Sequence, residues 1–155
     1  MEYDAIAMQE PYVQEYRARW ADMDFNQHMR NAAYLGVAEE TRFRYLASNG
    51  WGMEEFQRRQ IGPVVLEDRI TYRKELQLLE PFRVDFTLLG ITSDARKFRL
   101  RNRFFRTSDD ALCATVESFG LWFDIGQRRP VAPPPELARV WLALPRSEDF
   151  ASLDG

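Results

Sequence analysis

The chain has 155 residues and a formal net charge of −3, and 45% of its residues are hydrophobic. This length and composition predict one globular domain over residues 1–155, and they exclude a disordered chain. The weak negative charge gives no indication of nucleic-acid binding. The single cysteine, Cys113, excludes an intrachain disulfide and a multi-cysteine zinc site, which suits a cytoplasmic location. No run of about 18 apolar residues occurs, so we expect no membrane span.

The first third of the chain predicts a strand and two helices. Residues 1–10 are expected to be a weakly ordered lead-in, and residues 12–20 alternate in the manner of a strand with one wetter face. Residues 31–49 carry apolar side chains at helical spacing, with Asn31 as the predicted N-cap. A short helix is predicted over residues 53–60, before a Gly-Pro pair that ends it.

The remaining sequence predicts mostly strands. The alternating segments are 64–74, 82–92, 97–106 and 112–124. A C-terminal extension, residues 131–155, contains a short predicted helix over 136–144. An antiparallel sheet of about five strands with one long helix is an α+β arrangement.

Gly36 lies inside the long predicted helix, where glycine costs about 1 kcal/mol relative to alanine. One explanation is a site where another backbone comes very close, as for a helix packed inside a curved sheet. The other is an ordinary alanine-rich helix, and the sequence alone does not decide between them.

A polar loop leads directly onto the long helix. It contains Asp22, Asp24, Asn26 and the only histidine, His28. A helix N-terminus carries free N–H groups and partial positive charge. A carboxylate, an imidazole and backbone donors in one place can perform acyl-transfer chemistry. The alternative is structural, with the aspartate capping the helix and His28 making a structural hydrogen bond, and the residue types alone leave the two evenly balanced.

Other candidate sites are weaker. Cys113 could act as a nucleophile with His28, but a small buried residue in an alternating strand is the favoured interpretation. The sequence has no G-x-S-x-G, no cluster of metal ligands and no glycine-rich nucleotide motif. Arg99, Arg101 and Arg103 share one predicted sheet face. They form either a solvated face or a surface that attracts phosphates or an acidic carrier protein.

The stretch A-D-M-D-F-N-Q-H-M-R-N-A-A-Y-L-G resembles the hotdog-fold acyl thioesterases. It is closest to the D-x-N-Q-H-V-N-N pattern of plant acyl-carrier-protein thioesterases, and it is more loosely similar to the 4-hydroxybenzoyl-coenzyme A thioesterase group. The resemblance implies a sheet of about five strands wrapped around one long central helix. It also implies a homodimer or homotetramer, and a substrate joined to coenzyme A or acyl carrier protein with no separate cofactor.

The resemblance also implies roles for individual residues. Asp24, Asn26 and His28 match the catalytic residues of the plant motif. The segment T-Y-R-K-E-L resembles the plant E-Y-R-R-E-C, which places Glu75 at a functional glutamate. Leu76 stands where the plant enzymes have cysteine, so no cysteine mechanism carries over.

The expected reaction is thioester hydrolysis. Asp24 would be general base or nucleophile, Asn26 would hold the water or the carboxylate, and His28 would share its proton. Glu75 would be a second acid–base group. The other predicted substrate-binding residues are the backbone donors after His28, the acyl-slot residues and two arginines: Met29, Arg30, Asn31, Phe25, Tyr34, Arg99 and Arg101. The alternatives are a hotdog enoyl-thioester hydratase or dehydratase and a non-catalytic acyl-thioester-binding module.

Overall fold

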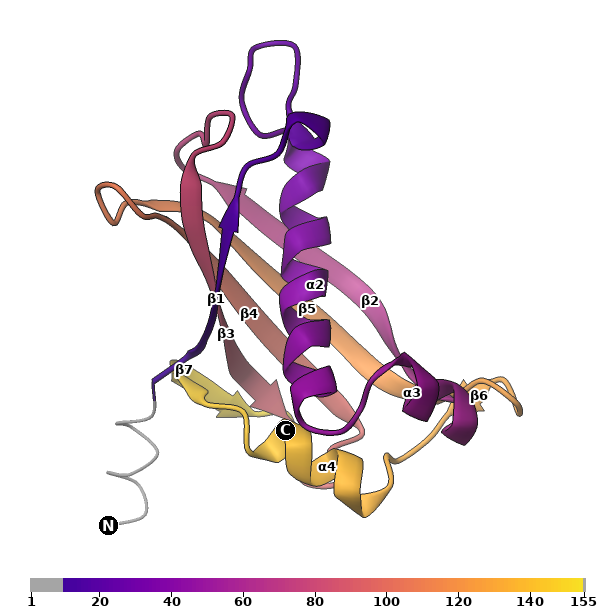
Figure 1. Ribbon diagram of the computed structural model, residues 1–155. Helices are drawn as coiled ribbons and strands as arrows, with labels where there is room; N and C mark the ends of the chain where they lie inside the picture. Colours follow the sequence, from indigo (N-terminus) through magenta and orange to yellow (C-terminus); the bar gives the residue numbers. More distant parts are fainter. Residues whose placement is uncertain (1–9, 155) are drawn as a thin grey trace.

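The computed structural model describes residues 10–154, so nearly all of the predicted lead-in lies outside the described part. One long helix, α2 (Asn31–Ser48), lies across a curled antiparallel sheet (Figure 1). The main strands follow the order β1-β3-β4-β5-β2. Their bounds are Tyr12–Arg17 for β1, Ile61–Tyr72 for β2, Pro81–Ile91 for β3, Lys97–Arg106 for β4 and Leu112–Asp124 for β5. The predicted hotdog architecture is confirmed.

The remaining elements are short helices and short strands. The 3-10 turn η1 (Trp20–Asp22) precedes the polar loop, and α3 (Met53–Arg59) follows α2. The C-terminal extension forms the predicted short helix, α4 (Pro135–Leu142). Two further strands, one just before this extension and one within it, were not predicted from the sequence. These are β6 (Arg129–Pro130), paired with β5, and β7 (Arg146–Ser152), which runs parallel to β3.

Side-chain alternation explains which face of the sheet meets α2. On β4 the residues Phe98, Leu100, Asn102 and Phe104 are buried, while the arginines between them face outward, as predicted. On β3 the even-numbered residues from Phe82 to Leu88 are buried as well, and so are Asp85 and Thr87 between them. Burial of these aromatic and aliphatic side chains against α2 supplies most of the driving force for folding.

Several element boundaries differ from the sequence predictions, and three of them have a clear structural meaning. Strand β1 ends at Arg17, before the predicted end at residue 20, because the chain turns through η1. The N-cap of α2 is Arg30, and no side chain caps the helix, so the prediction of Asn31 as the cap was wrong. Strand β2 begins three residues early and includes Pro63, which an edge strand tolerates because its outer N–H groups need no sheet partner.

Gly36 has no neighbouring atom within 4 Å of the position of an added Cβ. A close backbone approach at this glycine is therefore absent from the described chain. Ala38, which is fully buried, lies on the face of α2 that packs against the sheet.

A buried arginine connects the middle of α2 to the sheet. Arg42 is 6% exposed, and its Nε donates to Asn102 Oδ1 at 2.8 Å while Nη2 donates to Ser118 Oγ at 2.8 Å. The Ser118 hydroxyl donates in turn to Asp68 on β2. Burial lowers the pKa of the Arg42 guanidinium to about 10. The network joins α2, β4, β5 and β2 through groups that are costly to leave unpaired.

Strand β2 forms one edge of the sheet, and its only partner among residues 10–154 is β5. Most of its residues are exposed, including Val64, Val65 and Leu66. Within the same part of the chain, no helix has the length and apolar character that crossing a membrane requires.

Candidate active site

The polar loop projects beyond the N-terminal end of α2 (Figure 1). It is a tight turn over residues 23–29 that Asp24 holds together. Asp24 Oδ1 accepts the backbone N–H groups of Asn26 at 2.8 Å and His28 at 3.0 Å. The Asp24 N–H donates to the His28 carbonyl at 2.7 Å, and Gln27 adopts a left-handed φ of 64°. These contacts fix the Asp24 carboxylate, and Oδ2 accepts no hydrogen bond within the described residues.

The base of the loop is fixed by Asp22, which is buried. Its carboxylate accepts two hydrogen bonds from the Arg19 guanidinium, at 2.9 and 3.0 Å, and this pairing lowers the pKa of the Asp22 carboxyl. The Asp22 carbonyl accepts the N–H of Arg30 at 2.8 Å. Asp22 is thus a positioning residue that connects the two ends of the loop to the start of α2.

A second segment, between β2 and β3, pairs with the end of the loop. The Met29 N–H donates to the Leu76 carbonyl at 2.7 Å, and His28 forms an isolated β-bridge with Gln77. Glu75 is exposed and directly precedes this pairing. The structure therefore brings the segment of Glu75 next to the segment of Asp24, Asn26 and His28, although 47 positions separate His28 from Glu75 in the sequence.

The available backbone donors agree only in part with those expected after His28, because Asn31 is open whereas Met29 and Arg30 are not. The N–H groups of Met29 and Arg30 are already bonded to carbonyl oxygens. The first amides of α2, those of Asn31 and Ala32, have no acceptor within residues 10–154, and both residues are exposed. A helix leaves these groups unbonded, and they attract negative charge.

A groove of about 650 Å³ runs from the loop along α2 as far as Arg44, and we call it the basic groove because its arginines outnumber its two acidic residues, Asp22 and Glu40. Four arginines line it, namely Arg17, Arg19, Arg30 and Arg44. Arg19 and Arg44 each pair with a carboxylate, whereas Arg30 makes no ion pair within the described chain. The sequence analysis did not single out Arg17 or Arg19, and only their position just ahead of the polar loop could have indicated them.

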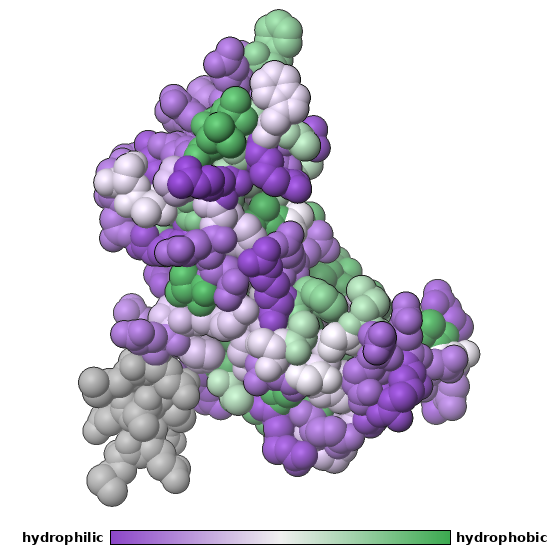
Figure 2. Space-filling model, in the orientation of Figure 1, coloured by the Kyte–Doolittle hydropathy of each residue, from purple (hydrophilic) through white to green (hydrophobic). Residues whose placement is uncertain are grey.

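The remaining predicted site residues separate into buried and exposed groups. Met29 and Tyr34 belong to the core. The Tyr34 ring packs against Tyr72 and Phe104, and burial raises the pKa of its hydroxyl to about 12. Phe25 is fully exposed at the loop tip, where Figure 2 shows apolar surface.

Arg99 and Arg101 lie on the outer face of the sheet, on the side away from α2. The structure does not bring them together with the polar loop. The Arg99 guanidinium stacks over the Phe119 ring at 5.0 Å. Arg101 donates two hydrogen bonds of 2.7 Å to Asp149 on β7, and a third of 2.8 Å to Glu117. Its donors are thus used within the chain, where they hold β7 against the sheet.

A sequence model of the thioesterase-like superfamily matches residues 18–141, which include the polar loop, α2 and four of the five main strands, β2 to β5. The chain therefore belongs to the thioesterase-like superfamily. This confirms the resemblance inferred from the loop motif.

Solved structures agree on the fold. A Staphylococcus aureus protein determined in complex with CoA superposes with a TM-score of 0.77 at 22% identity, covering 90% of this chain and 89% of that one. A 1,4-dihydroxy-2-naphthoyl-CoA thioesterase from Synechocystis gives 0.77 at 13% identity, with coverage of 89% and 100%. A probable thioesterase from Escherichia coli gives 0.72 at 19%, with coverage of 87% and 99%.

The pairing of Arg101 with Asp149 predicts a pH-dependent contribution to stability. Hydrogen bonds from Arg101 lower the pKa of the Asp149 carboxyl to about 2. A folded-state pKa below the unfolded value stabilises the protein above the unfolded pKa, and the contribution is lost as the pH falls from about 4 to about 2. We expect Asp149→Asn to lower Tm at neutral pH, and this deficit to shrink over that acid range.

The matched control is Glu148→Gln, because Glu148 is an exposed neighbour that makes no ion pair within residues 10–154. Its Tm should follow the wild type at every pH. A deficit of Asp149→Asn that stays constant down to the acid limit would contradict the assigned pairing.

Proposed function

We propose that the protein hydrolyses an acyl-coenzyme A thioester to the free acid and coenzyme A. The observation that carries this proposal is the Asp24 carboxylate, fixed by its own loop and placed directly ahead of the open amides of Asn31 and Ala32. A fixed carboxylate can activate water, and preorganised amides can stabilise an oxyanion. Membership of the thioesterase-like superfamily supports this assignment.

In the proposed reaction, the thioester carbonyl oxygen lies at the first amides of α2. Asp24 removes a proton from a water molecule whose oxygen attacks the carbonyl carbon. The negative charge then passes to the carbonyl oxygen, and Asn31 and Ala32 N–H groups stabilise it. One such donor contributes roughly 3–4 kcal/mol in other enzymes. The C–S bond breaks, and the leaving thiolate takes up the proton.

Three further side chains have supporting roles in this proposal. Asn26 holds the attacking water, and His28 passes the proton toward sulfur. Glu75 can supply a second acid–base group, because its segment pairs with the end of the loop. The reaction needs no group beyond these side chains and the coenzyme A of the substrate.

The basic groove favours coenzyme A as the thiol carrier. Arg19 and Arg30 of this groove lie next to the polar loop and the start of α2, where the sulfur end of a bound thioester would emerge. Arginine forms strong charge-assisted hydrogen bonds with phosphate. A structural neighbour was determined in complex with CoA. Binding of acyl carrier protein and a cytoplasmic location stay predictions from the sequence.

We further propose that the working unit is a homodimer formed along β2; a homotetramer stays a prediction from the sequence. An unpaired edge strand with exposed apolar side chains is a template for pairing with a second copy. Two more exposed apolar regions of the protomer would be buried by a second copy. These are the loop tip at Phe25 and the surface around Met53 and Ile125.

The direction of β2 relative to α2 would bring these apolar regions of two protomers together. The end of β2 lies at the start of α2, because the Tyr72 hydroxyl donates to the Asn31 carbonyl at 3.1 Å. The start of β2, at Ile61, lines a cavity together with Leu46 near the end of α2. Two-fold antiparallel pairing of β2 places the start of one strand opposite the end of the other. Each polar loop would then lie near the α3 end of its partner.

The catalytic assignment predicts that Asp24→Asn retains the loop and loses the reaction. The asparagine carbonyl oxygen can still accept the N–H groups of Asn26 and His28, but the side chain can no longer act as a base. We expect kcat for thiol release from acyl-coenzyme A to fall about 10²–10⁴-fold with an unchanged Tm.

Asp24→Ala separates the two roles of this side chain. It should lose the same activity and also lower Tm, because the loop amides lose their acceptor. If the folded Asp24→Asn variant kept the wild-type kcat/KM, the proposed reaction would be wrong.

The groove assignment predicts that Arg30→Gln raises KM for acyl-coenzyme A by roughly tenfold, the value of one charge-assisted hydrogen bond, with little change in kcat. The effect should disappear with acyl-N-acetylcysteamine thioesters, which lack the phosphates. Arg139→Gln, on exposed α4 at the other end of the molecule, is the control. Equal effects of Arg30→Gln on both substrates would refute phosphate binding at this residue.

The dimer predicts that Leu66→Asp gives a monomer with little hydrolytic activity, because it places a charge on the exposed apolar edge. Leu142→Asp is the matched control, since Leu142 is an exposed leucine on α4. Light scattering should give twice the chain mass for the wild type and for the control. An active monomeric wild type would overturn the dimer.

A further inference from the structure

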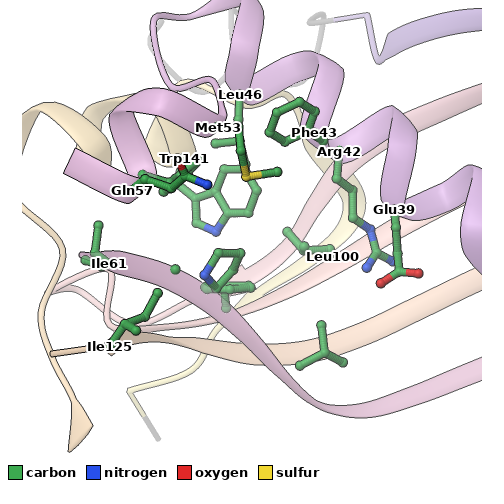
Figure 3. A pocket seen from close by; sticks show the side chains of 15 residues that line it. Glu39, Arg42, Phe43, Leu46, Met53, Gln57, Ile61, Leu100, Ile125 and Trp141 are labelled. Carbon is green, nitrogen blue, oxygen red and sulfur yellow. The ribbon is translucent and has the colours of Figure 1, made fainter. Parts of the chain in front are cut away.

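A second cavity, the α2–α4 cavity, lies at the opposite end of α2 from the polar loop. It has a volume of about 360 Å³ and is enclosed by the second half of α2, by α3, by the start of β2 and by α4 (Figure 3). Its walls are mainly apolar. They include Leu46, Met53, Phe56, Ile61, Leu100 and Trp141. No residue of the polar loop lines it.

One buried polar atom at the wall of this cavity has no hydrogen-bond partner among the described residues. Trp141 is 1% exposed, and its indole Nε1 has no hydrogen-bond acceptor among the described residues. Figure 3 shows the indole nitrogen directed toward the space between the helices and β2. An indole N–H is a donor only, and a buried donor without an acceptor costs free energy. An oxygen atom on a ligand would remove that cost.

The size of the cavity limits the ligand. A cavity of about 150 Å³ with apolar walls holds one benzene molecule. The α2–α4 cavity has room for roughly twice that volume, which corresponds to two small rings or a medium-length chain. Glu39, Arg42 and Gln57 also line the cavity, so its walls are mainly apolar with a few polar groups. Such walls are typical of small-molecule sites, where the polar groups fix orientation and specificity.

The position of the cavity relates it to the reaction. Ile61, at the start of β2, is part of its wall. In the proposed dimer, the start of β2 lies opposite the end of the partner's β2, where the partner's polar loop is found. An acyl group held at that loop would extend into the cavity of the facing protomer. Exposed Met53 and Ile125, both lining residues, lie on this surface.

We propose that the α2–α4 cavity binds the far end of the acyl group, and that Trp141 selects acyl groups with a neutral oxygen acceptor remote from the thioester. Keto-substituted or hydroxyl-substituted acyl groups are the substrate class. This inference rests on the proposed thioester hydrolysis and deepens it. Trp141 is a specificity-determining residue in this arrangement, and it takes no part in bond cleavage.

The test uses octanoyl-coenzyme A and a series of oxo-octanoyl-coenzyme A thioesters with the keto group at successive carbons beyond C3. In the wild type, one position should raise kcat/KM about three- to tenfold over octanoyl-coenzyme A, the effect of one neutral hydrogen bond. Trp141→Phe should remove this preference while still hydrolysing octanoyl-coenzyme A, because phenylalanine keeps the aromatic wall and lacks the N–H. A preference that survives in Trp141→Phe, or no preference at any position, overturns the inference.

Trp122→Phe is the matched control. Trp122 is also fully buried with an unpartnered indole nitrogen, and it packs against Trp141 at 5.5 Å between ring centroids, but it does not line the cavity. Both variants therefore lose a buried indole from the same cluster. Only Trp141→Phe should change the keto preference, and an equal loss in Trp122→Phe would assign the effect to repacking and overturn the inference.

Binding of the non-hydrolysable oxo-octyl coenzyme A thioethers separates this inference from the proposed function. Calorimetric titration should show the same three- to tenfold preference, again lost in Trp141→Phe. If thiol is released but no keto preference is found, the proposed hydrolysis is supported and the proposed role of Trp141 is wrong. Preferential binding without thiol release from any thioester supports the cavity and its ligand class, and overturns the hydrolase.

Discussion

The hydrogen bonds of Arg42 are the constraint on which the rest of the structure depends. Its guanidinium is buried between α2 and the sheet, where a charge is expensive unless it is hydrogen-bonded. Asn102 and Ser118 accept from it, and Ser118 extends the contact to Asp68 on the edge strand. The helix can therefore lie across the sheet in one position only. That position fixes both ends of α2, one beside the polar loop and the other beside the cavity.

Local patterns in the sequence were sufficient for most of this architecture. Alternation along Lys97–Arg106 assigned both faces of β4, and helical spacing located α2. The errors occurred where distant residues decide the outcome. Strand β7 exists because it pairs in parallel with β3 and because Asp149 meets Arg101, 48 positions away in the sequence. Neither β7 nor that ion pair leaves a local signal, and for this reason the arginines of β4 could equally be read as a phosphate-binding face.

The candidate site, too, could be predicted only in part from local sequence patterns. The motif indicated the family, and the match to the family model confirmed that resemblance. The spacing of Asp24, Asn26 and His28 could not show that the Asp24 carboxylate both accepts hydrogen bonds from its own loop and faces solvent. A structural aspartate and a reactive one have the same residue type in the same position. The spacing also could not show which backbone N–H groups are left without a hydrogen-bond acceptor. That depends on Met29 and Arg30 donating to carbonyls of other segments, which leaves the donor role to the first turn of α2.

A single protomer holds the polar loop and the cavity at opposite ends of one helix. A helix of 18 residues is about 27 Å long, and the cavity extends from Glu39, at the middle of α2, to Met53 and Ile61 beyond its end. A small acyl thioester held at the loop would therefore not reach the far wall of the cavity within one protomer. If both features serve one substrate, a second copy must bring the cavity of one chain to the loop of the other. The exposed edge strand, running opposite to α2, has the direction that such pairing requires. The apolar surface left open on the protomer then belongs to the active site as well as to the interface, and catalysis becomes coupled to assembly.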